Sequence, residues 1–145
     1  MLYADASVIV SAYLADEPDH PEWKARLFDG DDPVVVSEVA HVEVVSAFAA
    51  ASRAGRISDG SDLIARFEAD CTEGGPISLL AFRPGSVTER AAQLTRAHRL
   101  RTLDAIHLAV ALEDARPLAG EDELVFATRD VAQSQAAADL GFKVA

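Results

Sequence analysis

The segment MLYADAS, residues 1–7, indicates the fold class of this chain. It starts as a short apolar strand, Met1 to Asp5, and passes directly into the start of a helix at Ser7. In open parallel sheets, ligands bind beyond the carboxyl ends of the strands, so Asp5 stands where a site is expected. Taken alone, Asp5 or Ser7 is better explained as a helix N-cap.

Strands and helices alternate along the rest of the chain. Four more short apolar runs predict strands, at Val34 to Ser37, Ile77 to Leu80, Leu124 to Ala127 and Phe142 to Val144. Helical periodicity predicts helices at Ser7 to Leu14, Pro21 to Phe28, Val39 to Ala51, Val87 to Leu94, Leu103 to Leu112 and Val131 to Leu140. We expect Gly55 to end the third of these helices, Pro117 to stop the fifth and Gly141 the sixth. This alternation predicts an α/β fold, a three-layer α/β/α sandwich around a parallel five-stranded sheet.

Length and composition fit a single globular domain spanning residues 1–145. Half of the 145 residues are hydrophobic, and no linker, repeat or low-complexity tract interrupts them. A single cysteine, Cys71, excludes both an internal disulfide and a zinc site of several thiolates. No apolar run approaches the roughly 20 residues of a membrane helix, and no basic leader precedes Leu2. We therefore expect a soluble, cytoplasmic protein.

The net charge of −11 argues against a nucleic-acid partner, because phosphate binders usually carry a basic surplus. Acidic residues gathered around a divalent cation, however, lose their negative character once the cation binds. Basic residues are also concentrated in one stretch, which holds Arg90, Arg96, Arg99, Arg101 and His98. This basic stretch is explained equally well as a solvated helix face whose cations favour the helix C-terminus.

Three further acids have positions comparable with that of Asp5. Glu43 lies on or beside the apolar stripe of its helix, and a buried glutamate needs a metal or a basic partner. Asp104 follows Thr102, a natural N-cap, in the first turn of a helix. Asp130 follows a strand and Thr128, and it too is explained alone as an N-cap.

Together, these four acids predict one metal site at the carboxyl edge of the sheet. The ligands are hard oxygens without cysteine or histidine at metal-binding spacing, which favours Mg²⁺, with Mn²⁺ as a substitute. Ser7 and Thr128 add hydroxyls beside the two acids that end strands. A divalent cation in such a site lowers the pKa of a bound water and polarises a phosphoryl oxygen, which suits hydrolysis of a phosphodiester.

In this order, the acids and their surroundings resemble the PIN-domain ribonucleases, and specifically the VapC toxins of type II toxin–antitoxin systems. The most specific match is LDAIHLA, residues 103–109, around the third acid. The other matching segments are Tyr3 to Ser7, Ser37 to Glu43, Thr128 to Asp130, Ala137-Ala138 and Gly141-Phe142. The resemblance therefore covers nearly the whole chain.

The resemblance implies a parallel five-stranded sheet flanked by helices and Mg²⁺-dependent endonucleolytic cleavage of structured RNA such as tRNA or rRNA. It implies a small VapB-like antitoxin that neutralises the toxin, and commonly a toxin homodimer or a larger toxin–antitoxin assembly. By position it assigns Asp5, Glu43, Asp104 and Asp130 as the metal-binding catalytic acids, with Ser7 and Thr128 as supporting hydroxyls. The place of the fourth acid varies in the family, so Asp130 could act behind the metal ligands.

Two other classes of function remain open. A phosphate-accepting response-regulator module also has acids at strand ends, but it needs an aspartate after the middle strand, where this chain has Leu79-Leu80-Ala81. A catalytically inactive PIN-like domain that binds RNA or protein is the second alternative.

Among the remaining side chains, we expect His107 to be packed or hydrogen-bonded in the core rather than to act as a general base. Core packing is also the expected role of Trp23 and Phe28.

Overall fold

The computed structural model describes residues 1–145 and contains one five-stranded sheet in which all strands are parallel. The strand order is β3-β2-β1-β4-β5, so the first strand lies in the middle. The strands are β1 (Leu2–Ala4), β2 (Val34–Ser37), β3 (Ile77–Leu80), β4 (Val125–Ala127) and β5 (Lys143–Val144). The five predicted strands and their parallel pairing are confirmed.

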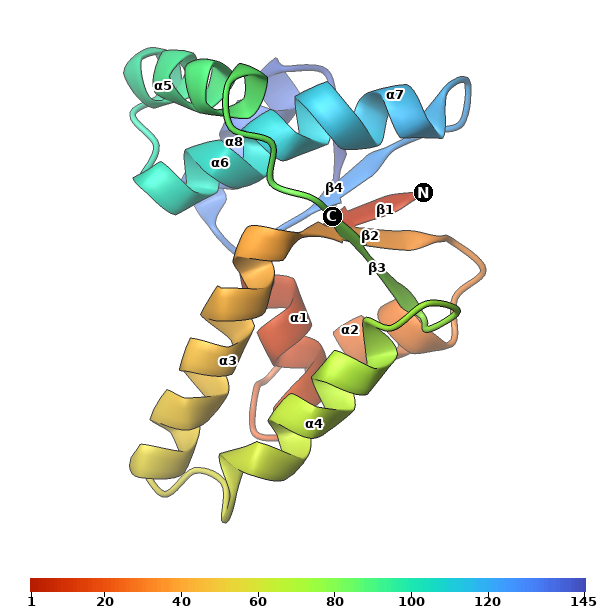
Figure 1. The fold of residues 1–145 in the computed structure, drawn as a ribbon, viewed down its shortest axis with the longest axis vertical. Coiled ribbons are helices and arrows are strands. Elements are labelled where there is room, and N and C mark those ends of the chain that lie inside the picture. The colour runs from red at the N-terminus through yellow and green to blue at the C-terminus, as the bar shows by residue number, and fades with distance from the viewer.

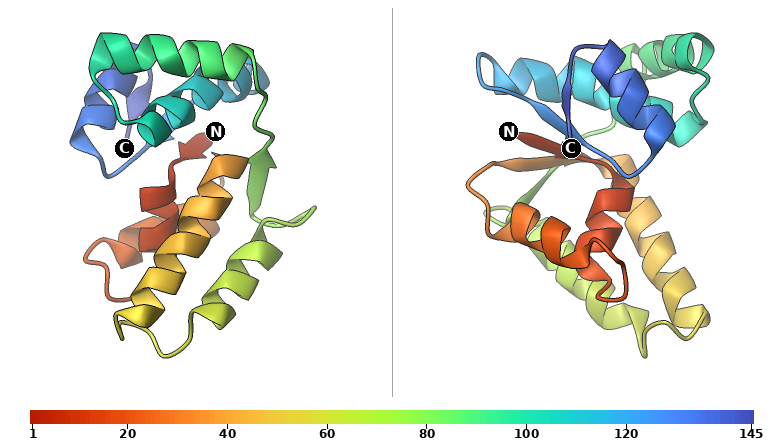
Figure 2. Two further views of the ribbon diagram at one scale, coloured as in Figure 1. Left: turned by 60° about the vertical axis from the view of Figure 1, so that its left-hand side comes forward. Right: turned by 180° about the vertical axis from the view of Figure 1, so that it is seen from behind.

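Helices cover both faces of the sheet (Figure 1). One layer contains α1 (Ala6–Tyr13), α2 (His20–Phe28), α3 (Glu38–Arg53) and α4 (Gly60–Asp70). The other contains α5 (Ser86–His98), α6 (Thr102–Val110), α7 (Arg116–Ala119) and α8 (Val131–Asp139). Two further views show the sheet between these layers (Figure 2). The predicted three-layer sandwich is confirmed.

The pleat of β1 divides the core into two apolar clusters. Leu2 and Ala4 face the α1–α4 layer, whereas Tyr3 faces the α5–α8 layer. All three residues are fully buried. Successive side chains of a strand point to opposite faces, so an uninterrupted apolar run is required of a strand covered on both sides. Trp23 and Phe28 pack with the first cluster, as expected.

Helix α4 was not predicted, although its sequence carries the signals of a helix. Asp59 accepts a hydrogen bond from the backbone N–H of Ser61 at 2.8 Å and caps the first turn. Phe67 on this helix is fully buried and packs edge-on against the ring of Tyr13. The sparse apolar positions Leu63, Ile64 and Phe67 fall at helical spacing, and this pattern is typical of a short amphipathic helix.

The expectation that Pro117 stops the fifth predicted helix was wrong. Helix α6 runs into a π-helical turn, η1 (Ala111–Ala115), and then into α7, which has Pro117 in its first turn. Proline lacks a backbone donor and disrupts regular α-helical bonding, so a local change to π geometry lets the helix continue. Thr102 is also not an N-cap, because α6 begins at Thr102 after Arg101.

Gly55 and Gly141 follow α3 and α8 with positive φ angles of 70° and 82°, as expected of residues that end helices. None of the helices combines the length and apolar character needed to cross a membrane.

The packing of α4 predicts a large effect of Phe67→Ala on stability. Removing a fully buried phenylalanine leaves a cavity in the first core cluster, and the free energy of unfolding should fall by about 3–5 kcal/mol. The measurement is urea unfolding followed by circular dichroism. Leu118→Ala is the control, because Leu118 is 59% exposed and its truncation should change stability by less than about 0.5 kcal/mol. Equal effects of both variants would contradict this account of α4.

Candidate active site at the carboxyl edge of the sheet

Asp5 lies at the carboxyl end of the central strand and is only 5% exposed. Its Oδ1 accepts hydrogen bonds from the Ser7 hydroxyl at 2.6 Å and from the Val8 backbone N–H at 3.1 Å. The second of these bonds makes Asp5 the N-cap of α1. Asp5 is therefore the helix N-cap that its sequence position alone suggests, and it is also part of a wider polar cluster.

Thr128 joins Asp5 to the end of β4. Its Oγ1 lies 2.8 Å from Asp5 Oδ2 and 2.5 Å from Oε1 of Gln133, which is fully buried on α8. The Asp130 backbone N–H donates to the same oxygen at 3.0 Å. A hydroxyl has one proton to donate, so Thr128 cannot donate to both acceptors at once. Either the Asp5 carboxylate or the Gln133 amide oxygen is therefore left without this donor.

Burial raises the pKa of the Asp5 carboxyl above its usual value. The hydrogen bonds from Ser7 and Thr128 and the nearby His107 oppose this shift without cancelling it. The charged form of Asp5 is therefore held in an unfavourable environment, which a cation would relieve.

Asp104 lies in the first turn of α6 and is half-buried. Its pKa is also raised, first by burial and then by the negative charges of Asp130 and Asp5, whereas Arg101 and His107 act in the opposite direction. Because the charges of Asp5 and Asp130 both act on Asp104, these three acids form one electrostatic cluster. Asp130 additionally caps α8, because its Oδ1 accepts from the Gln133 backbone N–H at 2.9 Å.

Glu43 on α3 has a basic partner within the chain, one of the two explanations that its sequence position left open. Its Oε2 lies 2.7 Å from Nε2 of His107, which is 2% exposed. A carboxylate only accepts, so Nε2 carries a proton, and in the neutral ring Nδ1 accepts from the Tyr3 hydroxyl at 3.1 Å. Burial and the charges of Asp5 and Glu43 raise the pKa of Tyr3, which keeps this hydroxyl protonated. His107 is hydrogen-bonded in the core, as expected.

Ser7 and Arg129 link the site to the loop between α1 and α2. The Arg129 backbone N–H donates to the Ser7 hydroxyl at 3.0 Å. The Arg129 guanidinium contacts Glu17 at 2.8 Å and Asp19 at 2.9 Å. Sequence reasoning did not identify Arg129, Gln133 or Tyr3 as parts of the site. Their neighbours Asp130 and Asp5 were the available signal, but only the fold shows these contacts.

The structure brings all six predicted site residues to one edge of the sheet, although their carboxylates do not converge on a single point. No three acidic, histidine or cysteine side chains are close enough together to enclose an ion. Glu43 is directed to His107, and Asp130 caps its helix. The donors nevertheless fit a hard divalent cation, because all are oxygens and the charges of Asp5 and Asp104 are unfavourable without one.

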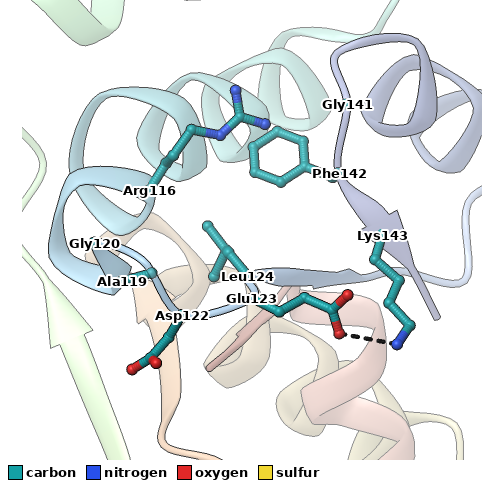
Figure 3. A pocket seen from close by; sticks show the side chains of 9 residues that line it. All are labelled: Arg116, Ala119, Gly120, Asp122, Glu123, Leu124, Gly141, Phe142 and Lys143. Carbon is teal, nitrogen blue, oxygen red and sulfur yellow. Dashed lines mark hydrogen bonds and ion pairs between the residues drawn. The ribbon is translucent and has the colours of Figure 1, made fainter.

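A separate pocket lies at the opposite edge of the sheet, where β4 and β5 begin (Figure 3). Three of its four charged side chains are already paired or stacked, and Asp122 is the fourth. Lys143 pairs with Glu123 at 2.9 Å, and the Arg116 guanidinium lies 4.0 Å from the centre of the Phe142 ring. This pocket contains none of the predicted site residues.

Comparisons with known proteins agree with this architecture. The family model of the PIN domain matches residues 2–138. Ribonuclease VapC45 and Ribonuclease VapC49, from two Mycobacterium tuberculosis strains, CDC 1551 / Oshkosh and H37Rv, are each 33% identical over 119 residues. These residues make up 81% of this chain and 78% of each relative.

Two solved structures share the fold over nearly their whole length. A toxin-antitoxin complex from Klebsiella pneumoniae has a TM-score of 0.65 at 17% identity, covering 100% of this chain and 96% of that one. The crystal structure of Mycobacterium tuberculosis VapC20, a sarcin-ricin loop cleaving toxin, has a TM-score of 0.68 at 16% identity, with coverage of 98% and 96%.

The raised pKa of Asp5 predicts that Asp5→Asn stabilises the protein at neutral pH. The folded protein binds a proton at Asp5 more tightly than the unfolded chain, so Asp5 reduces stability as pH rises through its folded-state pKa. Each pKa unit corresponds to about 1.4 kcal/mol. An asparagine amide would donate to Thr128 Oγ1, which frees the threonine hydroxyl for Gln133. Urea unfolding between pH 4 and pH 8 should show an advantage of the variant that grows with pH.

Asp59→Asn provides a control of opposite sign. Asp59 is exposed, and the hydrogen bond from the Ser61 backbone N–H lowers its pKa. Its stabilising effect is therefore present at neutral pH and lost as pH falls through its folded-state pKa. An Asp5→Asn difference that stays constant or turns unfavourable at high pH would contradict the assignment of Asp5 as a destabilising buried charge.

Proposed function

The chain belongs to the PIN-domain family of VapC ribonucleases, and on this premise we propose that residues 1–145 form one Mg²⁺-dependent endoribonuclease domain acting as a toxin. The observation that carries the proposal is the cluster of Asp5 and Asp104, whose negative charges the protein itself leaves unfavourable. Neighbouring acids whose pKa values are raised by burial and by each other's charge are typical of functional sites.

Asp5 and Asp104, with Asp130 and Glu43, would hold the metal. A bound Mg²⁺ would polarise the phosphodiester and lower the pKa of the attacking water. The remaining residues orient these acids. Ser7, the Val8 N–H and Thr128 fix the Asp5 carboxylate, and His107, supported by Tyr3, holds Glu43.

We infer that the substrate is a structured cellular RNA such as tRNA or rRNA. The relative VapC20 is described as cleaving the sarcin-ricin loop, which supports this substrate class. Asp104 and Asp130 are half-buried, and neither lines an enclosed pocket, so a polymer chain can approach them from solvent.

We infer that a small VapB-like antitoxin neutralises the activity, since one structural relative was solved as a toxin-antitoxin complex. The rim of the site also has apolar side chains to offer a protein partner. Val42, Leu103 and Val131 are 69%, 41% and 84% exposed, and each is the sequence neighbour of one of the acids. Exposed apolar surface next to a functional site is typical of interaction surfaces. A toxin homodimer, alone or within a larger toxin–antitoxin assembly, is part of the same proposal.

The proposal predicts that Asp5→Asn and Asp104→Asn each reduce RNA cleavage in Mg²⁺ by about 100-fold or more, a loss expected when a group that stabilises developing charge is removed. The measurement is gel analysis of RNA incubated with purified protein, together with growth of cells that express it. Asp62→Asn, an exposed acid in the first turn of α4, should cleave like the wild type. Cleavage at the wild-type rate by both site variants would contradict the proposal.

A catalytically inactive module that binds RNA or protein is the alternative. Calorimetric titration with Mn²⁺ separates the two, because the nuclease should bind the ion with an affinity that drops at least about tenfold in Asp104→Asn. A domain that has lost catalysis should show no binding that depends on these carboxylates. Binding that is identical in the wild type and the variant would favour the inactive module.

A further inference from the structure

We propose that Arg96, Arg99 and Arg101, at the turn between α5 and α6, form a surface that binds the RNA phosphate backbone beside the acidic site. This inference rests on the proposed ribonuclease function and names the part of the chain that holds the substrate. We refer to these three residues as the arginine surface. All three side chains are exposed.

The arginine surface is unpaired in a chain with a large excess of acids. Six other cationic side chains form ion pairs with carboxylates, namely those of Arg56, Arg66, Arg83, Arg90, Arg129 and Lys143. Arg90, which the sequence grouped with the basic stretch, contacts Glu113 at 2.7 Å and so does not belong to the arginine surface. Arg96, Arg99 and Arg101 have no carboxylate partner, although 24 acids are available. Four other cationic side chains also lack one, those of Lys24, Arg26, Arg53 and Arg116, but no three of these lie within six positions of the sequence.

The arginine surface lies next to the proposed catalytic acids. Arg101 immediately precedes α6, which carries Asp104 in its first turn, and the Arg101 charge acts on the Asp104 carboxylate. Helices α3 and α6 lie in opposite layers (Figure 1), and the Glu43–His107 contact joins them near their N-terminal ends. Arg96 lies in the last turn of α5, and Arg99 is the residue that caps this helix, so only two residues separate the two arginines.

Stability of the helices does not explain two of the three arginines. Arg96 in the last turn of α5 is favoured by the helix dipole, but Arg101 is the N-cap residue of α6, where a positive charge is unfavourable. Arg101 also makes no side-chain capping hydrogen bond, which serine or aspartate would provide at this position.

Arg99 has an unfavourable backbone conformation. Its φ of 56° and ψ of 34° lie in the left-handed region, and it is the only non-glycine residue with positive φ. This position, at the end of a helix, is usually glycine. The helix dipole favours a cation at this C-cap, but the left-handed backbone favours glycine over arginine, so the fold alone does not call for arginine here.

Phosphate binding by this surface is compatible with the net charge of −11. At physiological ionic strength, charges are screened over about 8 Å, so an approaching phosphate responds mainly to the nearest guanidinium groups. Arginine forms bidentate hydrogen bonds with phosphate oxygens, which suits a position where the backbone must be held next to the acids.

The test measures how tightly fluorescently labelled bulk tRNA binds to residues 1–145 carrying Asp5→Asn. This substitution prevents cleavage during the measurement. Arg96→Gln, Arg99→Gln and Arg101→Gln are added singly and together, and affinity is followed against salt. Each neutralised phosphate contact contributes about 0.9 to the slope of log affinity against log salt for duplex and about 0.7 for single strands. The triple variant should therefore lower the slope by about 2–3. Arg53→Gln, an exposed unpaired arginine at the far end of α3, is the matched control.

Two further variants separate binding from folding. Arg99→Gly and Arg101→Ser should melt at the same temperature as the parent or higher, because glycine fits the left-handed position and serine caps α6. Both should nevertheless weaken tRNA binding as the glutamine variants do. In the cleaving protein, Arg96→Gln and Arg99→Gln should raise KM several-fold with little change in kcat.

Several outcomes would overturn the inference. A triple variant that binds tRNA with the affinity and salt slope of Arg53→Gln would do so, and so would the absence of tRNA binding in the parent. Loss of antitoxin binding with unchanged tRNA binding would assign the surface to an acidic protein segment instead. Failure of the proposed function is distinguished by a different result, the absence of Mg²⁺-dependent cleavage in the protein that retains Asp5.

Discussion

The buried carboxylate of Asp5 is the constraint on which the rest of the site depends. It ends the central strand, where helices cover both faces of the sheet and water has little access. Ser7 and the start of α1 hold one of its oxygens, and Thr128 at the end of β4 contacts the other. A charge in this position is tolerated only with such partners, and their contacts in turn fix how β1, β4 and α1 meet.

The neighbouring polar groups divide into those that carry charge and those that orient it. Gln133, fully buried, spans from Thr128 Oγ1 to the backbone oxygen of Asp104, and so connects two corners of the site. His107, supported by Tyr3, orients Glu43 in the same way, although Glu43 comes from α3 in the opposite layer. Helices α3, α6 and α8 thereby become coupled within their first two turns. The geometry of the acids is thus a property of the core and not only of the surface.

The same edge of the sheet combines opposite charges at close range. The acids are partly buried and repel one another, whereas the arginine surface is exposed and free of carboxylate partners. A polyanionic substrate would be repelled by the acids alone and by the net charge of the chain. A divalent cation held by the acids would reduce this repulsion at the site itself. The guanidinium groups beside the acids would reduce it for the neighbouring phosphates. Both features are accounted for by one function, phosphodiester cleavage.

The sequence by itself determined the strand order in the chain, the layered α/β class and the place of each acid, because apolar runs and helical periodicity are local patterns. It missed α4, whose apolar face is only Leu63, Ile64 and Phe67, and it misjudged Pro117, whose effect depends on the π-helical turn before it. Only the tertiary structure decided that Glu43 meets His107, that Gln133 bridges Thr128 and Asp104, and that Arg96, Arg99 and Arg101 have no carboxylate partner. These contacts join residues far apart in the chain, and no local pattern encodes such distances.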